Sequence, residues 1–157
     1  MIIACAFDHA GEPFGTVVAD AVRAAGHEPL DLGVCDDYPD SAYDAAAAIR
    51  DGRAERAIVV CGSGAGVAVA CSKLPGIRAS VCHDTYSAAQ CVQHDDVNVL
   101  CLGARIIGPV YAAHCVAAFA GASFTGEERH VRRLSKVLAF EAHGFDANPH
   151  HHPGSTT

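Results

Sequence analysis

Short apolar runs alternate with alanine-rich stretches along almost the whole chain. The apolar runs lie at 1–7, 28–32, 57–61, 79–82 and 97–102, and each is too short for a helix. Between them, apolar positions recur at helical spacing at about 13–25, 40–52, 66–74, 84–93 and 108–120. Strands that alternate with helices form right-handed βαβ crossovers and a parallel sheet. We therefore predict an α/β fold: a single Rossmann-like three-layer domain with a five-stranded parallel sheet.

The chain after Gly126 departs from this alternation. A last helical segment at about 127–142 precedes no strand, so we expect an extra C-terminal helix that packs on the sheet or on a second subunit. We expect the domain to cover residues 1–143 and residues 144–157 to form a flexible tail. Three adjacent histidines, 150–152, lie in that tail, and we expect no native metal site there.

Composition restricts the function. The 157 residues include 11 Lys and Arg against 18 Asp and Glu, a formal net charge of −7 with neutral histidines. Nucleic acids and anionic membranes attract broad basic surfaces, so we expect neither as a partner. No apolar run is long enough to span a bilayer, and the N-terminus does not resemble a secretory signal. We expect a reduced, soluble, cytoplasmic protein.

The eight cysteines lie at least nine residues apart. The C-x2-C pairs that mark zinc or redox sites are therefore missing, and we expect no metal site. Most of the cysteines are expected to be small buried apolar residues. Cys61 differs from the others because it ends an apolar run directly before a glycine-rich turn.

This turn, Cys-Gly-Ser-Gly-Ala-Gly at 61–66, opens a helix. Its glycines let the backbone approach a ligand, and its N–H groups could hold either a phosphate or a developing oxyanion. It is neither a G-x-G-x-x-G motif nor a Walker motif. A helix N-terminus favours a thiolate at Cys61, which could act as a base or a nucleophile. Ser63 could form a hydrogen bond to the thiol or to a substrate, or it could cap the helix. The alternative for the whole turn is a tight strand-to-helix connection that binds no ligand.

Polar side chains also stand at other strand ends, namely Asp8, His9, Tyr38 and His94. Loops that follow adjacent parallel strands converge, so we expect Asp8, His9 and Cys61 to share one crevice. His94 stands at the end of a predicted helix, where it could instead be a helix cap. Four further histidines are interpreted as surface or packing residues: His27, His83, His114 and His143.

The order of these motifs resembles the type B ribose-5-phosphate isomerase family, which also includes the galactose-6-phosphate isomerase subunits. The resemblance covers nearly the whole chain except the tail. It rests on Asp8-His9-Ala10-Gly11, Asp37-Tyr38-Pro39, the turn 61–66, Gly76-Ile77-Arg78-Ala79, His94-Asp95-Asp96 with Asn98-Val99-Leu100, Gly103-Ala104-Arg105, and Arg129-His130 with Arg133. It implies an aldose–ketose isomerase of a phosphorylated sugar that needs no metal or organic cofactor.

The resemblance also implies a role for each residue. Cys61 would move a proton from C2 to C1 through an enediolate, and Ser63 would assist. His94 with Asp8 would open the furanose ring. The implied substrate contacts are His9, Tyr38, Gly62, Gly64, Ala65, Gly66, Asp95, Arg105, Arg129, His130 and Arg133, with the glycine-loop N–H groups stabilising the oxyanion. The site would be shared between the subunits of a homodimer or a dimer of dimers.

Two departures from the family pattern leave the identity of the sugar undetermined. Asp95 stands where ribose isomerases carry Asn, and a carboxylate there would repel an enediolate. Ser72 stands before Lys73 where many relatives have Asn. We expect ribose 5-phosphate and ribulose 5-phosphate as substrates, with a tetrose 4-phosphate or hexose 6-phosphate as the alternative. A non-catalytic module that binds a sugar phosphate or nucleotide, and a thiol hydrolase using Cys61 and His94, are the competing hypotheses.

Overall fold

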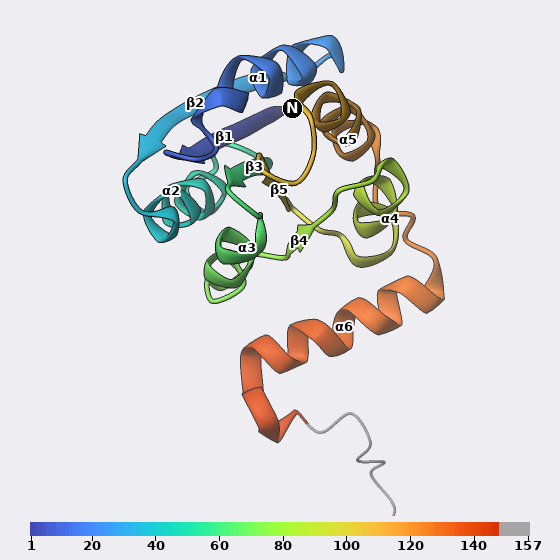
Figure 1. Ribbon diagram of the computed structural model, residues 1–157. Helices are drawn as coiled ribbons and strands as arrows, with labels where there is room; N and C mark the ends of the chain where they lie inside the picture. Colours follow the sequence, from blue (N-terminus) through green and yellow to red (C-terminus); the bar gives the residue numbers. More distant parts are fainter. Residues whose placement is uncertain (148–157) are drawn as a thin grey trace, which may run out of the picture. The chain divides into compact units, whose positions relative to one another are not determined.

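Five parallel strands form the centre of the computed structural model, which describes residues 1–147. They are β1 (Ile2–Asp8), β2 (Glu28–Cys35), β3 (Arg56–Cys61), β4 (Ala79–Val81) and β5 (Val99–Gly103). The strand order is β2-β1-β3-β5-β4, and all neighbours pair in parallel (Figure 1). The predicted five-stranded parallel sheet is confirmed.

Helices cover both faces of the sheet. One face carries α1 (Gly15–Ala24), α4 (Thr85–Asp95) and α5 (Pro109–Gly121), packed on a core that includes Ile58 and Leu100. The other face carries α2 (Tyr38–Arg50) and α3 (Ala65–Cys71), packed around Val59 and Cys101. A short 3-10 turn, η1 (Glu12–Phe14), leads into α1. Figure 1 shows α1 beside α5 and α2 beside α3, the three-layer arrangement that the sequence predicts.

Burial on both faces explains why the central strands are uniformly apolar. Every residue of β5 is buried, as is β3 from Ala57 to Cys61, so neither strand has an exposed face that would call for polar side chains. β2 lies at an edge and alternates irregularly between exposed and half-buried positions. The predicted strand 28–32 is too short for this reason: the observed β2 continues through Gly33 and Val34, both exposed.

The sheet has a switch point between β1 and β3. From β1 the chain crosses to β2 at one edge, whereas from β3 it crosses toward β4 at the other edge. The two crossovers leave in opposite directions and open a crevice at the carboxyl ends of β1 and β3, where open α/β sheets bind their ligands. Asp8 ends β1 and Cys61 ends β3, so both come to this crevice.

Arg56 ties the amino end of β3 to the end of α5. Its Nη1 donates to the carbonyl of Phe119 at 2.8 Å, and its Nη2 donates to the carbonyl of Ala122 at 2.9 Å. The guanidinium also lies over the Phe119 ring, 5.3 Å from the centroid. Carbonyls at a helix end lack partners within the helix, and Arg56 supplies donors to two of them here, although the Phe119 carbonyl also accepts the Ala122 N–H at 3.4 Å.

A second junction holds the amino ends of β4 and β5 together. Arg78 Nε donates to the carbonyl of Asp96 at 2.6 Å, and its Nη2 reaches the Asp96 carboxylate at 2.7 Å. Asn98 accepts the Arg78 N–H at 2.8 Å and donates to the carbonyl of Gly76 at 2.9 Å. The junction therefore fixes the end of α4 at the amino edge of the sheet.

From Thr125 on, the chain forms a second compact unit, distinct from Met1–Phe124. Its described part consists of α6 (Glu128–His143) and the 3-10 turn η2 (Gly144–Asp146), so the predicted C-terminal helix is confirmed. The domain boundary at 143 and the flexible tail from 144 stay predictions, since residues 148–157 lie outside the described residues. Within residues 1–147, no helix combines the length and apolar character needed to cross a membrane.

Candidate active site

A cavity of about 370 Å³ lies at the carboxyl ends of β1 and β3. This volume suits a small ligand. Its lining combines a thiol, a carboxylate, a hydroxyl, a phenol and a guanidinium with backbone glycines: Asp8, Tyr38, Cys61, Gly62, Ser63, Gly66, Arg105 and Ile106. All of these except Ile106 are candidate site residues from the sequence, and the fold brings them together.

Cys61 is contacted by the loop that follows it. The backbone N–H of Gly64 donates to Cys61 Sγ at 3.1 Å. Gly64 reaches this position with a φ of +80°, in the left-handed region that glycine adopts without strain. A Cβ atom there would lie 3.1 Å from the carbonyl carbon of Leu102. The loop therefore packs on the end of β5 and directs a polar N–H at the sulfur, the kind of contact that a thiolate accepts.

Asp8 is buried and held by its own loop. One carboxylate oxygen, Oδ1, accepts the N–H groups of Ala10 at 2.9 Å and Gly11 at 2.8 Å. A Cβ atom at Gly11 would lie 2.1 Å from the carbonyl oxygen of Val60, so only glycine lets this loop lie against β3. The close approach brings Asp8 to the side of the cavity that Cys61 occupies.

Ser63 is exposed at the start of α3. Its Oγ accepts the N–H of Ala65 at 3.3 Å, but the N-cap residue of α3 is Gly64, so the helix-cap interpretation of Ser63 is wrong. The hydroxyl proton is still available as a donor. Ser63 can therefore stay fixed to the loop while it donates to a ligand in the cavity.

Two side chains lie directly against loop glycines. A Cβ atom at Gly66 would lie 3.0 Å from Tyr38 Cε2, and one at Gly62 would lie 3.4 Å from Arg105 Nη1. The loop after β5 is bonded to the same turn, because the Arg105 N–H donates to the carbonyl of Gly62 at 3.0 Å. Glycine at these positions thus lets an aromatic ring and a guanidinium reach the cavity.

His83 belongs to this region although its sequence position suggests a surface or packing role. Its Nε2 accepts the N–H of Gly103 at 2.9 Å, at the carboxyl end of β5. Burial lowers the pKa of His83, which favours the neutral ring that this bond requires. The only available sequence signal is that His83 directly follows the apolar run of β4.

His9 follows β1 as predicted, but it does not line the cavity. The ring is exposed, and Nδ1 lies 3.4 Å from the carbonyl oxygen of Asp36. The structure therefore places His9 beside Asp8 in the chain without bringing it among the cavity residues.

His94 and Asp95 form the last turn of α4 and lie away from the cavity within one chain. The Arg78–Asp96 junction holds this turn at the amino edge of the sheet, whereas Cys61 ends its strand at the carboxyl edge. Gln90 Nε2 lies 2.8 Å from His94 Nδ1. The expected pair of His94 with Asp8 is thus not formed within one chain, because α4 runs back along the sheet between β4 and β5.

The candidate phosphate ligands on α6 belong to the second unit. Arg129 pairs with Glu127 at 2.9 Å, and Arg133 is exposed. His130 is 1% exposed, and its Nδ1 lies 2.8 Å from Thr125 Oγ1, so its ring does not face solvent as the two arginines do. Contact of these three residues with a substrate stays a prediction.

The other cysteines have environments unlike that of Cys61. All eight are free thiols, and seven are buried, with Cys35 half-buried. Burial raises the pKa of Cys5 to about 12 and that of Cys115 to about 11, so both are protonated at neutral pH. Most of the cysteines are packing residues, as predicted, whereas Cys61 is the one that lines the cavity.

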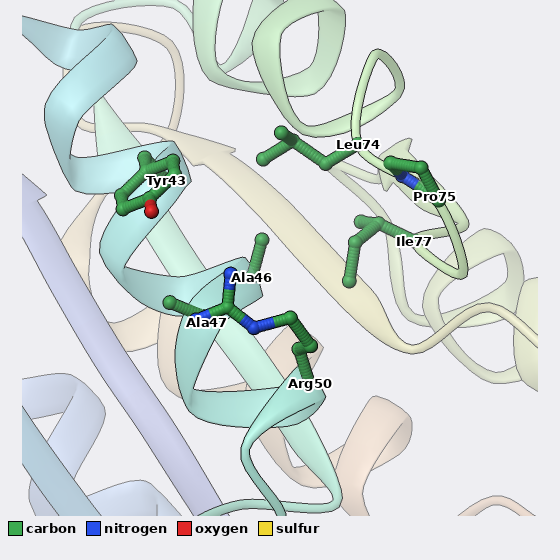
Figure 2. Close-up of a pocket in the computed structure, with 7 residues that line it drawn as sticks. All are labelled: Tyr43, Ala46, Ala47, Arg50, Leu74, Pro75 and Ile77. Carbon is green, nitrogen blue, oxygen red and sulfur yellow. The ribbon is translucent and has the colours of Figure 1, made fainter.

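A second, smaller pocket lies between α2 and the segment that joins α3 to β4. Figure 2 shows Leu74, Pro75 and Ile77 on that segment, across from Tyr43, Ala46, Ala47 and Arg50 on α2. Its volume is about 70 Å³, and its lining is mostly apolar. The Arg50 guanidinium is paired with Asp51 at 2.8 Å. This pocket is too small for a sugar phosphate, and its lining contains no thiol or carboxylate.

A thiol and a glycine loop at the switch point of a parallel sheet define an α/β enzyme that acts on a small polar ligand. Residues 3–137 match the family model described as Ribose/Galactose Isomerase. The ribose-5-phosphate isomerase B of Escherichia coli is 36% identical over 143 residues, which cover 88% of this chain and 95% of that protein. The D-erythrulose-4-phosphate isomerase of Pectobacterium atrosepticum is 46% identical over 89 residues, 57% of this chain and 59% of that protein.

Structural similarity agrees with the sequence match. The type B ribose 5-phosphate isomerase of Trypanosoma brucei has a TM-score of 0.86 and 40% identity, over 89% of this chain and 98% of that chain. The chain therefore belongs to the ribose/galactose isomerase family. The expected class of enzyme, an aldose–ketose isomerase of phosphorylated sugars, is confirmed at the level of the family.

Proposed function

We propose that this chain interconverts ribose 5-phosphate and ribulose 5-phosphate in the cavity between β1 and β3, with the Cys61 thiolate as the base. The observation that carries the proposal is the 3.1 Å contact from the Gly64 N–H to Cys61 Sγ at the wall of that cavity. The fixed N–H offsets negative charge on the sulfur without any rearrangement. A thiolate held in this way can accept a carbon-bound proton.

The proton transfer proceeds through an enediolate. The thiolate removes the C2 proton of the open-chain aldose, and the electron pair moves to the C1 carbonyl oxygen. The thiol then returns the proton to C1, while O2 loses its proton and becomes the ketose carbonyl. We propose that Ser63, whose oxygen accepts the Ala65 N–H, carries the proton from O2 to O1.

Charge in the cavity supports a phosphorylated substrate. Arg105 lies over Gly62 in the cavity wall, and its planar guanidinium can make two hydrogen bonds to one phosphate. Asp8, fixed by two N–H groups, is the carboxylate that would assist ring opening. Sugar phosphates of this kind are intermediates of carbohydrate metabolism, and we place the enzyme in the cytoplasm.

A second copy of the chain completes the proposed site. His94 lies at the amino edge of the sheet, so its proposed role in ring opening requires a partner subunit to present it. The exposed basic residues Arg129 and Arg133 are proposed to reach the partner's cavity and bind phosphate. Apolar side chains exposed along α6 support a subunit contact: Val131, Val137, Leu138 and Phe140 are each at least 41% exposed.

A tetrose 4-phosphate is the second candidate substrate. It is favoured by the 46% identity over 89 residues to the D-erythrulose-4-phosphate isomerase. Asp95, where ribose isomerases carry Asn, is exposed at the end of α4 and would approach the sugar only from a partner subunit.

The test is a substrate panel. Purified protein is incubated with four-, five- and six-carbon aldose phosphates while ketose formation is followed. Turnover of ribose 5-phosphate with the highest kcat/KM supports the proposal, and preference for a four-carbon substrate replaces it with the alternative. Tight binding without turnover of any sugar would instead favour the non-catalytic module. A covalent adduct with an activated ester, in place of turnover, would favour the thiol hydrolase.

A further inference from the structure

His83 occupies the place where the β4–β5 ladder stops. The pairing runs from Ala79 opposite Val99 to Val81 opposite Cys101, and the Cys82 N–H still donates to the carbonyl of Cys101 at 3.4 Å. The next β5 donor on this side is the N–H of Gly103, which a longer β4 would have bonded through a backbone carbonyl. The His83 imidazole accepts that N–H at 2.9 Å instead.

The Gly103 peptide packs directly against the glycine-rich turn 61–66, which carries Cys61. A Cβ atom at Gly103 would lie 2.6 Å from the carbonyl carbon and 2.7 Å from the carbonyl oxygen of Ser63. A Cβ atom at Gly64 would lie 3.3 Å from the Gly103 nitrogen. Gly103 also pairs with Cys61 in the register between β3 and β5. A rotation of the Gly103 peptide would therefore move the loop that directs an N–H at Cys61.

The same peptide begins the segment that carries Arg105. Directly after Gly103, the Ala104 N–H donates to the carbonyl of Cys61 at 2.9 Å, and the Arg105 N–H donates to the carbonyl of Gly62 at 3.0 Å. The direction of this segment depends on the Gly103 peptide that His83 holds. One side chain just after the edge strand β4 thus acts on both the Cys61 loop and the segment that carries Arg105.

We propose that His83 is a positioning residue for the isomerase reaction, which holds the Gly103 peptide so that the Cys61 loop and Arg105 keep their catalytic geometry. The inference rests on the proposed function. His83 does not line the cavity and so acts through Gly103, not on the substrate. The bond requires the neutral ring with its proton on Nδ1, because Nε2 must accept.

Two amides of different length provide a matched test. The Gln side-chain oxygen stands about as far from Cβ as His Nε2 does, whereas the Asn oxygen is one bond shorter. His83→Gln should therefore keep the bond to Gly103, and His83→Asn should lose it. For ribose 5-phosphate we expect His83→Asn and His83→Leu to lower kcat about tenfold with KM changed less than about twofold. His83→Gln should stay within about threefold of the parent protein.

The control is His114→Leu, which removes an exposed imidazole from α5 and should leave kcat unchanged. Equal activity in His83→Asn and His83→Gln, or full kcat in His83→Leu, would overturn the proposal. Amide hydrogen exchange of Gly103 in the ¹⁵N-labelled protein gives a second readout that needs no turnover. Exchange should be faster in His83→Asn than in His83→Gln, and equal exchange counts against the bond.

These measurements separate the two proposals. If the parent protein turns over no sugar phosphate, the proposed function fails, and the exchange rates still test whether His83 holds Gly103. If the parent protein is active and the His83 variants are equally active, the positioning role fails while the isomerase assignment stands.

Discussion

The backbone N–H of Gly64 lies 3.1 Å from the sulfur of Cys61 and donates to it. The contact depends on a left-handed φ at Gly64 and on close packing against Leu102. The thiol that ends β3 is therefore held by the turn that follows it.

Cys61→Ser should remove turnover while ligand binding survives. A serine hydroxyl is a far weaker base than a thiolate, so we expect kcat to fall by about 10²- to 10⁴-fold. Binding of ribose 5-phosphate, measured by calorimetry, should change little. Cys35→Ser, at a half-buried thiol outside the cavity, is the control and should keep full activity. Substantial turnover in Cys61→Ser would remove this residue as the base.

Alkylation should select Cys61 over the more exposed Cys35. Burial is the main cause that raises the pKa of Cys35, so its thiol is protonated at neutral pH and reacts slowly. Peptide mapping after brief treatment with iodoacetamide at pH 7.5 should find the label on Cys61 before it appears on Cys35. Ribose 5-phosphate should slow this labelling and leave that of Cys35 unchanged. Faster modification of Cys35 would contradict a thiolate at Cys61.

Gly66→Ala should raise KM without loss of stability. The new methyl group would lie 3.0 Å from the Tyr38 ring, which must move from its place in the cavity wall. We expect KM to rise about three- to tenfold, roughly 1 kcal/mol, with kcat little changed. Alanine also favours the helical conformation of α3, so the free energy of unfolding should not fall. Gly121→Ala, with no atom within 4 Å of the new Cβ, is the matched control.

Arg56→Met should destabilise the fold without touching the active site. It removes two charge-assisted hydrogen bonds and leaves the carbonyls of Phe119 and Ala122 without this donor. We expect a loss of about 2–4 kcal/mol in the free energy of unfolding, measured with urea. Arg23→Met breaks only an exposed ion pair with Asp20 and should cost less than about 1 kcal/mol. Equal losses in the two variants would be evidence against the role assigned to Arg56.

Acid should weaken the fold through His83. Burial lowers the pKa of His83 in the folded state below its ordinary value of 6.5. The unfolded chain therefore binds more protons at this site as the pH falls below about 6.5, and the contribution to stability is lost in that direction. His83→Gln has no group that titrates there. The urea midpoint of His83→Gln should fall less between pH 7 and pH 5.5 than that of the parent protein. Identical falls would show that His83 does not contribute to the acid sensitivity of the fold.

Local pattern is enough to predict the layers of this protein. The apolar runs that form β3 and β5 are apolar throughout because both faces of those strands are buried. A strand buried on both faces can therefore be predicted from the composition of a few consecutive residues. The turn at 61–66 is likewise local, since its glycines are needed where the backbone itself packs closely. The alternation of strands and helices, and a crevice at the carboxyl ends of the strands with Cys61 as its thiol, follow from the sequence, whereas the switch point follows from the strand order.

Which histidine lies near Cys61 was decided only by the tertiary structure. His83 directly precedes α4 and His94 lies in its last turn, and the only local signal that separates them is that His83 follows an apolar run. Because α4 runs back along the sheet, its two ends lie at opposite edges: His83 at the carboxyl edge with Gly103, and His94 at the amino edge with the Arg78–Asp96 junction. Contacts between segments distant in the chain depend on strand order and helix direction, which periodicity does not encode.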